Sequence, residues 1–118
     1  MKTLLVVDDE AGIAEALEEL LSDEGFHVQV ALNGKEGLAR IAEKRPDLIL
    51  LDYMMPVMNG GEVLSALQGD AARRSIPVIL MSVLPRSSIP QEGQSTAFLR
   101  KPFSMDRLLA EIHRLLGD

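Results

Sequence analysis

Cysteine and tryptophan are absent from this chain of 118 residues, and its aromatic residues are three Phe and one Tyr. The lack of cysteine excludes a disulfide framework, a thiolate zinc site and a cysteine nucleophile, and it favours a reducing compartment, so a cytoplasmic location is expected. The hydrophobic fraction is nevertheless 47%, so the core must be aliphatic. One domain spanning residues 1–118 is expected, because two domains of this total length would bury too little apolar surface.

Basic residues are in the minority. Twelve Lys and Arg against 18 Asp and Glu give a formal charge of -6, so no broad basic surface is available for a phosphate backbone. Direct binding of nucleic acid or of acidic membrane lipids is therefore not expected. The N-terminal apolar run is also short. It stops at Asp8, so it is much shorter than the apolar segment of a signal peptide or of a helix that spans a membrane.

Short apolar runs alternate with helical periodicities along the chain. The runs that are typical of strands buried on both faces are Thr3–Val7, Leu48–Leu51, Pro77–Met81 and Ala97–Leu99. The alternating segment 26–30 predicts a strand at a sheet edge, closed by an Asn33-Gly34 turn. Apolar residues at helical spacing predict helices between Glu10 and Gly25 and over 35–44, 60–67 and 105–116, the last with Ser104 as its N-cap.

The segment from Val83 to Thr96 breaks this pattern. Its two prolines, one glycine and four hydroxyl residues leave room for at most one short turn of helix. Strand and helix otherwise alternate, which predicts a doubly wound α/β fold with a five-stranded parallel sheet and a shortened or irregular fourth helix. Ligands of such sheets bind beyond the carboxyl ends of the strands.

Residues whose side chains can bind a ligand or take part in a reaction follow the carboxyl ends of these strands. Asp8 and Asp9 follow the first strand, Asp52 the third, Ser82 the fourth and Lys101 the fifth. Each alone is best explained as a loop residue or a helix cap, but together they are expected to converge. Three close carboxylates repel one another unless they are protonated or bridged by a cation, and an all-oxygen site suits Mg²⁺.

A shared proton among the carboxylates stays open as an alternative, although it leaves Lys101 and Ser82 without a role. A phosphoryl group gives them one, because its oxygens would be met by the metal, the Lys101 ammonium and the Ser82 hydroxyl. Asp52 is then the expected carboxylate nucleophile.

Over essentially its whole length the chain resembles the receiver domain of response regulators, the CheY-like proteins of two-component signalling. The resemblance rests on Asp8-Asp9, on Asp52 within LLDYMMPVMNG, on Ser82 after PVILM, and on Lys101-Pro102-Phe103. It implies the flavodoxin-like strand order 2-1-3-4-5, which is carried over from the family.

The resemblance also implies a reaction. Asp52 would accept a phosphoryl group from the phosphohistidine of a sensor histidine kinase or a phosphotransfer protein. The domain itself would catalyse the transfer, followed by slow autodephosphorylation rather than by turnover of a substrate. Mg²⁺ would be held by Asp9, Asp52 and the backbone carbonyl of Met54, with Asp8 acting mainly through metal-bound water.

A switch is implied as well. Ser82 and Lys101 would contact the phosphoryl oxygens, and Phe98 falls at the family's switch-aromatic position, although an isolated Phe is more often a core residue. Phosphorylation is expected to draw Ser82 toward the phosphoryl group and Phe98 inward, and so to change a partner-binding surface. The partner would be a downstream protein or an effector domain absent from this chain. The Lys101–Pro102 bond is expected to be cis.

Two features depart from the family pattern. Val83 stands where most receivers have a small residue, usually Ala, and its branched side chain could narrow access to Asp52. The segment 83–96 is shorter and richer in proline than the usual fourth-helix region, so the output surface is expected to differ.

Other functions fit parts of the pattern. A phosphate-ester hydrolase would want a second Asp two residues after its nucleophile, where this chain has Met54. A flavin-binding module would want several aromatic rings, and only Tyr53 is near a predicted strand end. A receiver-like module that binds its partner independently of phosphorylation is the stronger alternative, favoured by Val83 and the reduced helix.

Overall fold

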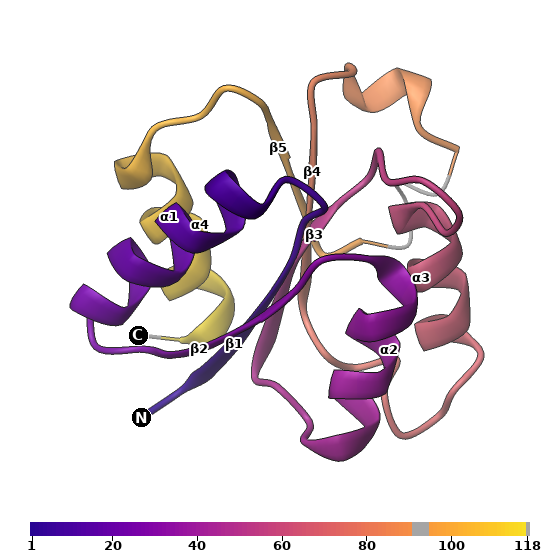
Figure 1. The fold of residues 1–118 in the computed structure, drawn as a ribbon, viewed down its shortest axis with the longest axis horizontal. Helices are drawn as coiled ribbons and strands as arrows, with labels where there is room; N and C mark the ends of the chain where they lie inside the picture. Colours follow the sequence, from indigo (N-terminus) through magenta and orange to yellow (C-terminus); the bar gives the residue numbers. More distant parts are fainter. Residues whose placement is uncertain (91–94, 118) are drawn as a thin grey trace.

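The computed structural model describes residues 1–90 and 95–117, in which five strands form one parallel sheet between two layers of helices (Figure 1). The strands are β1 (Thr3–Val7), β2 (His27–Ala31), β3 (Leu48–Asp52), β4 (Val78–Ser82) and β5 (Ala97–Arg100), in the order β2-β1-β3-β4-β5. The helices are α1 (Ala11–Asp23), α2 (Gly34–Glu43), α3 (Gly60–Gln68) and α4 (Met105–Leu116). The predicted doubly wound fold and strand order are confirmed. No helix in these two ranges is long and apolar enough to cross a bilayer.

Each face of the sheet carries its own aliphatic core. Helices α1 and α4 cover one face and α2 and α3 the other (Figure 1). Alternate residues of a strand point to opposite faces, so in β1 Leu4 and Val6 belong to the first core whereas Leu5 and Val7 belong to the second. Strands β1, β3 and β4 are buried throughout, while β2 is partly exposed at the edge, as its alternating sequence predicts.

Side-chain caps fix where the helices begin. The Asn33 side chain accepts a hydrogen bond of 2.7 Å from the Glu36 N–H, so Asn33 is the N-cap of α2, and Gly34, predicted as part of the turn after β2, is the first residue of the helix. Helix α2 consequently spans Gly34–Glu43 rather than 35–44. Ser104 caps α4 as predicted, by accepting from the Arg107 N–H. Strand β2 begins one residue later than predicted, because the Phe26 N–H donates to the Leu21 carbonyl at the end of α1 rather than to a neighbouring strand.

In its described residues, 83–90 and 95–96, the connection between β4 and β5 contains one 3₁₀ turn, η1 (Arg86–Ser88). Ile89 follows it and is buried in the second core, which anchors the connection to the α2–α3 side of the sheet. The prediction of at most one short helical turn holds for 83–90 and 95–96, whereas residues 91–94 lie outside the described residues. The Lys101–Pro102 bond is cis, as expected.

Gly60 gives a test of the packing that positions β3. A Cβ atom at Gly60 would lie 2.7 Å from the Asp52 carbonyl oxygen and 2.8 Å from the Tyr53 Cα. Gly60→Ala should therefore force β3 and α3 apart and lower the free energy of unfolding by about 1–3 kcal/mol, measured by urea denaturation.

Gly12→Ala is the matched control, because a Cβ at Gly12 in α1 meets nothing within 4 Å. This substitution should raise the free energy of unfolding by about 0.5–1 kcal/mol, the usual gain of Ala over Gly in a helix. A Gly60→Ala variant as stable as the parent would show that the contact between β3 and α3 is looser than described.

Candidate functional site

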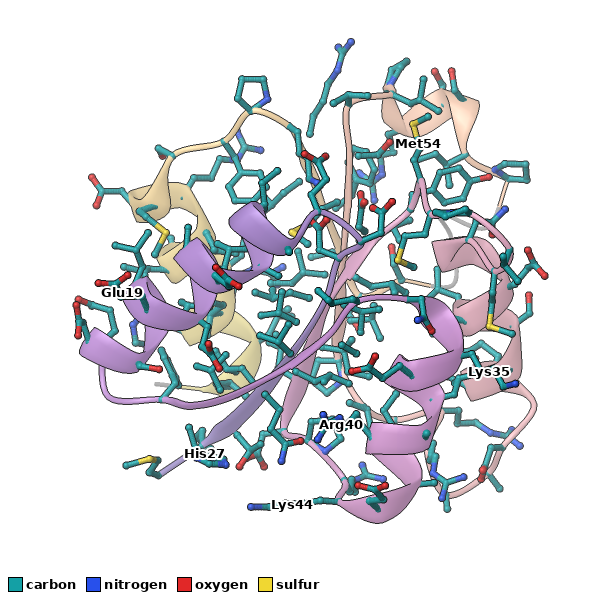
Figure 2. The ribbon with its side chains drawn as sticks, viewed as in Figure 1. Glu19, His27, Lys35, Arg40, Lys44 and Met54 are labelled. Carbon is teal, nitrogen blue, oxygen red and sulfur yellow. The ribbon has the colours of Figure 1, made fainter. Side chains whose placement is uncertain are left out.

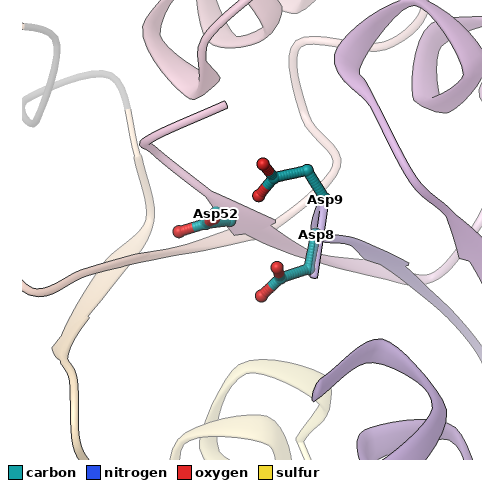
Figure 3. Close-up of side chains that lie close together, drawn as sticks. All are labelled: Asp8, Asp9 and Asp52. Carbon is teal, nitrogen blue, oxygen red and sulfur yellow. The ribbon is translucent and has the colours of Figure 1, made fainter. Parts of the chain in front are cut away.

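Three carboxylates converge beyond the carboxyl ends of β1 and β3. Asp8 and Asp9 follow β1 and Asp52 ends β3, and the two strands pair in parallel with Val7 opposite Leu51. One oxygen from each carboxylate lies within 4.8 Å of the others, and Figure 3 shows the three side chains gathered at these strand ends. Asp8 and Asp52 are buried, 0% and 4% exposed, whereas Asp9 is exposed. The predicted convergence of the three acids is confirmed.

Lys101 lies against the same cluster. Its Nζ donates a hydrogen bond of 3.1 Å to Asp8 Oδ2 and lies 3.3 Å from Asp52 Oδ1. The other oxygen of Asp8 accepts from the Glu10 N–H at 3.0 Å. Asp8 is thus held by the backbone on one side and by the ammonium on the other, and the same ammonium lies against Asp52.

The electrostatics follow from this crowding. Burial, and next the negative charge of Asp8, raise the pKa of Asp52 from 3.8 to about 6, although the Lys101 ammonium offsets part of the effect. Burial alone would lower the pKa of Lys101, but its hydrogen bond to Asp8 and the charge of Asp52 outweigh that, so the pKa is raised above 10.5. Three carboxylates against one ammonium leave two negative charges in excess once Asp52 is ionised, which favours a divalent cation.

A cavity of about 290 Å³ opens onto the cluster. It is lined by Asp9, Glu10, Asp52, Met54, Val83 and Lys101. Met54 is 51% exposed and Val83 56% exposed, and Figure 2 shows Met54 at the opposite end of the sheet from His27 and Lys44. Val83 therefore lines the cavity that opens onto Asp52 and is partly open to solvent, while its narrowing of access to Asp52 stays a prediction.

Ser82 lies behind this cavity rather than on its lining. It ends β4 and is only 1% exposed, and its Oγ accepts a hydrogen bond of 3.0 Å from the Leu84 N–H. A hydroxyl that accepts one hydrogen bond still carries a proton to donate.

Phe98 stands apart from the acids. It is half-buried on β5, opposite Leu80 of β4 in register, and it packs against the core on the α2–α3 face. Its contacts are those of a residue at the border of the core, and part of its side chain remains exposed.

Sequence reasoning missed two residues around the cavity. Glu10 lines it, and Arg100 donates from Nε to the carbonyl oxygen of Val83 at 3.2 Å. Neither its residue type nor its position in the sequence distinguishes Arg100 from an ordinary exposed residue. The one available signal is the parallel register, which places Arg100 opposite Ser82.

Comparison with known proteins agrees with this geometry. The family model described as the response regulator receiver domain matches residues 4–113. The response regulator Rre1 of Synechocystis is 36% identical over 119 residues, which cover 98% of this chain and 52% of Rre1. The chain thus spans about half the length of the curated relatives it matches.

Two solved structures share the fold over nearly their whole length. The chemotaxis protein CheY4 of Vibrio cholerae is 33% identical with a TM-score of 0.91, covering 98% of this chain and 99% of that one. The response regulator TrrA of Thermotoga maritima, solved in complex with Mg²⁺ and BeF, is 32% identical with a TM-score of 0.90, covering 98% and 100%. Because the family match extends over the sheet, the helices and the acidic cluster, this chain belongs to the response regulator receiver domains of two-component signalling.

Proposed function

We propose that the chain, as one receiver domain over residues 1–118, accepts a phosphoryl group on Asp52 from the phosphohistidine of a sensor kinase or phosphotransfer protein. A carboxylate oxygen of Asp52 forms a bond to phosphorus as the bond from phosphorus to the imidazole nitrogen breaks, and the electron pair of that bond returns to the imidazole. The observation that carries the proposal is the Lys101 ammonium, 3.3 Å from Asp52 within an acidic cluster that opens to a cavity.

Lys101 and Ser82 have complementary parts in this reaction. The Lys101 ammonium lies where it would meet a phosphoryl oxygen as negative charge develops there. Ser82 would donate its hydroxyl proton to another phosphoryl oxygen after turning out from behind the cavity. This movement would couple phosphorylation to the connection between β4 and β5, and Phe98 would become more buried as the connection shifts.

The residues fit a bound Mg²⁺. Asp9, Asp52 and the backbone carbonyl of Met54 would hold it and Asp8 would act mainly through a bound water, because hard oxygen ligands and excess negative charge are what Mg²⁺ prefers. When bound, the ion neutralises charge on the phosphoryl oxygens.

The physiological setting is inferred from the family. The phosphodonor would be a histidine kinase or phosphotransfer protein in the cytoplasm, and the output would pass to a downstream protein or to an effector domain. Neither nucleic acid nor membrane would be bound directly, since the chain carries a formal charge of -6.

The first prediction concerns the phosphoryl adduct. Incubation with acetyl phosphate and Mg²⁺ should add one phosphoryl group to the intact mass, because the small donor can enter the cavity. Asp52→Asn should abolish the adduct and a chelator should suppress it. Asp23→Asn, at the exposed end of α1, is the matched control and should leave the adduct unchanged.

A folded protein that takes up no phosphoryl group would contradict the proposal as stated. Val83→Ala then separates two causes. Recovery of the adduct in this variant would mean that Val83 closes the site, whereas continued absence would favour the phosphate-independent interaction module.

The second prediction links pH, metal and stability. The pKa of Asp52 is raised in the folded state, so the folded protein binds more protons than the unfolded chain between about pH 4 and pH 6, and stability falls as the pH rises through that window. At pH 8, in a chelator, Asp52→Asn should therefore raise the free energy of unfolding by about 1–3 kcal/mol, and the gain should shrink toward pH 4. The measurement is urea denaturation at a series of pH values.

Mg²⁺ should offset the repulsion between Asp52 and the neighbouring carboxylates. At a tenfold excess over its dissociation constant, Mg²⁺ should stabilise the parent protein at pH 8 by about 1.4 kcal/mol and Asp52→Asn by less. Equal stabilisation of both proteins would argue against Asp52 as a ligand.

The third prediction concerns the switch. Ser82→Ala should still be phosphorylated on Asp52, but the ring signals of Phe98 in NMR spectra should change much less on phosphorylation than in the parent. Phe26, buried in the other core, is the internal reference. A full change of the Phe98 signals in Ser82→Ala would show that Ser82 does not carry the coupling.

A further inference from the structure

Three hydrogen bonds hold the turn that follows β4. The Lys101 N–H donates to the Ser82 carbonyl at 2.7 Å, and the Leu84 N–H donates to Ser82 Oγ at 3.0 Å. Between them, Arg100 Nε donates to the Val83 carbonyl at 3.2 Å. Arg100 is the last residue of β5 and lies opposite Ser82 in the sheet, so its backbone is fixed and its side chain ties the Val83 peptide to β5.

Val83 forms a wall shared by two cavities. The first is the cavity of about 290 Å³ that opens onto Asp52, and the second, of about 440 Å³, is lined mainly by apolar side chains of α1 and of the segment after β5, such as Ile13 and Phe103. Glu10, Val83 and Lys101 line both. A shift of the Val83 peptide would therefore change the width of the entrance to Asp52.

We propose that Arg100 is a positioning residue that holds Val83 across the entrance and so limits the access of small phosphodonors and of water to Asp52. This role rests on the proposed phosphorylation of Asp52. In the hydrolysis step, the oxygen of a water forms a bond to phosphorus while the bond between Asp52 and phosphorus breaks. The products are the Asp52 carboxylate and inorganic phosphate, and the proton of the water passes to solvent.

The direction of the effect follows from this geometry. Without the Arg100 hydrogen bond, the Val83 peptide is free to move away from the entrance, and both the uptake and the loss of the phosphoryl group become faster. The Lys101 N–H still donates to the Ser82 carbonyl, so the backbone from which the Ser82 and Lys101 side chains extend stays in place. Arg100 would thus extend the lifetime of the phosphorylated state at the expense of reactivity toward small donors.

Two substitutions of matched length isolate the hydrogen bond. In Arg100→Gln the amide nitrogen occupies the place of Nε along the side chain and still donates, whereas in Arg100→Met a methyl group occupies that place. The rates of adduct formation from acetyl phosphate and of adduct hydrolysis are measured by intact mass. Arg100→Met should accelerate both by about two- to tenfold, the range expected for one lost hydrogen bond, and Arg100→Gln should restore rates close to those of the parent.

Two further measurements show whether Arg100 acts through Val83. In a Val83→Ala background, Arg100→Met should change neither rate by more than about twofold, because the side chain that narrows the entrance is gone. Hydrogen exchange of the Leu84 amide in the unphosphorylated protein should be faster in Arg100→Met than in Arg100→Gln.

The outcomes distinguish this role from the proposed function. If the parent protein forms the adduct but Arg100→Met behaves like the parent, or if Met and Gln have equal effects, the positioning role is wrong and phosphorylation stands. If the parent protein forms no adduct, the phosphorylation of Asp52 is what fails, and the role of Arg100 at that site fails with it.

Discussion

The Lys101 ammonium is the interaction on which the site depends. Asp8 and Asp52 are buried at the carboxyl ends of two adjacent strands, where water cannot disperse their charge, and such burial is costly unless an opposite charge lies close. Lys101 contacts both carboxylates. Because it comes from the far side of β4, one side chain connects the ends of β1, β3 and β5, and the parallel sheet holds all three at fixed distances.

The negative charge of the site is only partly neutralised, because one ammonium lies against a cluster of three carboxylates. The remaining repulsion shows in the raised pKa of Asp52. Excess negative charge of this kind favours a divalent cation, and Asp52, the proposed nucleophile, lies beside the Lys101 ammonium that would meet the incoming phosphoryl oxygens. The same imbalance therefore supports both the proposed Mg²⁺ site and the proposed phosphorylation of Asp52.

The sequence predicts the sheet and the acidic cluster well because both follow from the strands. Short apolar runs such as Thr3–Val7 favour buried strands, and the parallel arrangement brings the residues after them to one edge. The start of α2 was predicted less well, because Asn33 can serve equally as a turn residue or as an N-cap and the choice depends on one side-chain bond.

Arg100 was missed since its partner is a backbone carbonyl, which leaves no trace in residue type or spacing. The depth of Ser82 behind the cavity is likewise a product of packing that no motif records.

The connection between β4 and β5 affects the surface that a partner would contact rather than the acidic site. Ser82 and Lys101 are placed by the parallel pairing of β4 with β5, which runs from Ile79 opposite Ala97 to Ser82 opposite Arg100. The entropy lost when the loop joining those strands closes depends only weakly on the length of the loop. A connection with little helix in its described residues thus leaves Ser82 and Lys101, the proposed phosphoryl-binding groups, in register. Ser82 joins the two regions, because its backbone is fixed by the sheet whereas its hydroxyl is bonded to the first turn of the loop at Leu84. Any rotation of that hydroxyl toward Asp52 must be transmitted into the loop, whatever structure the loop has.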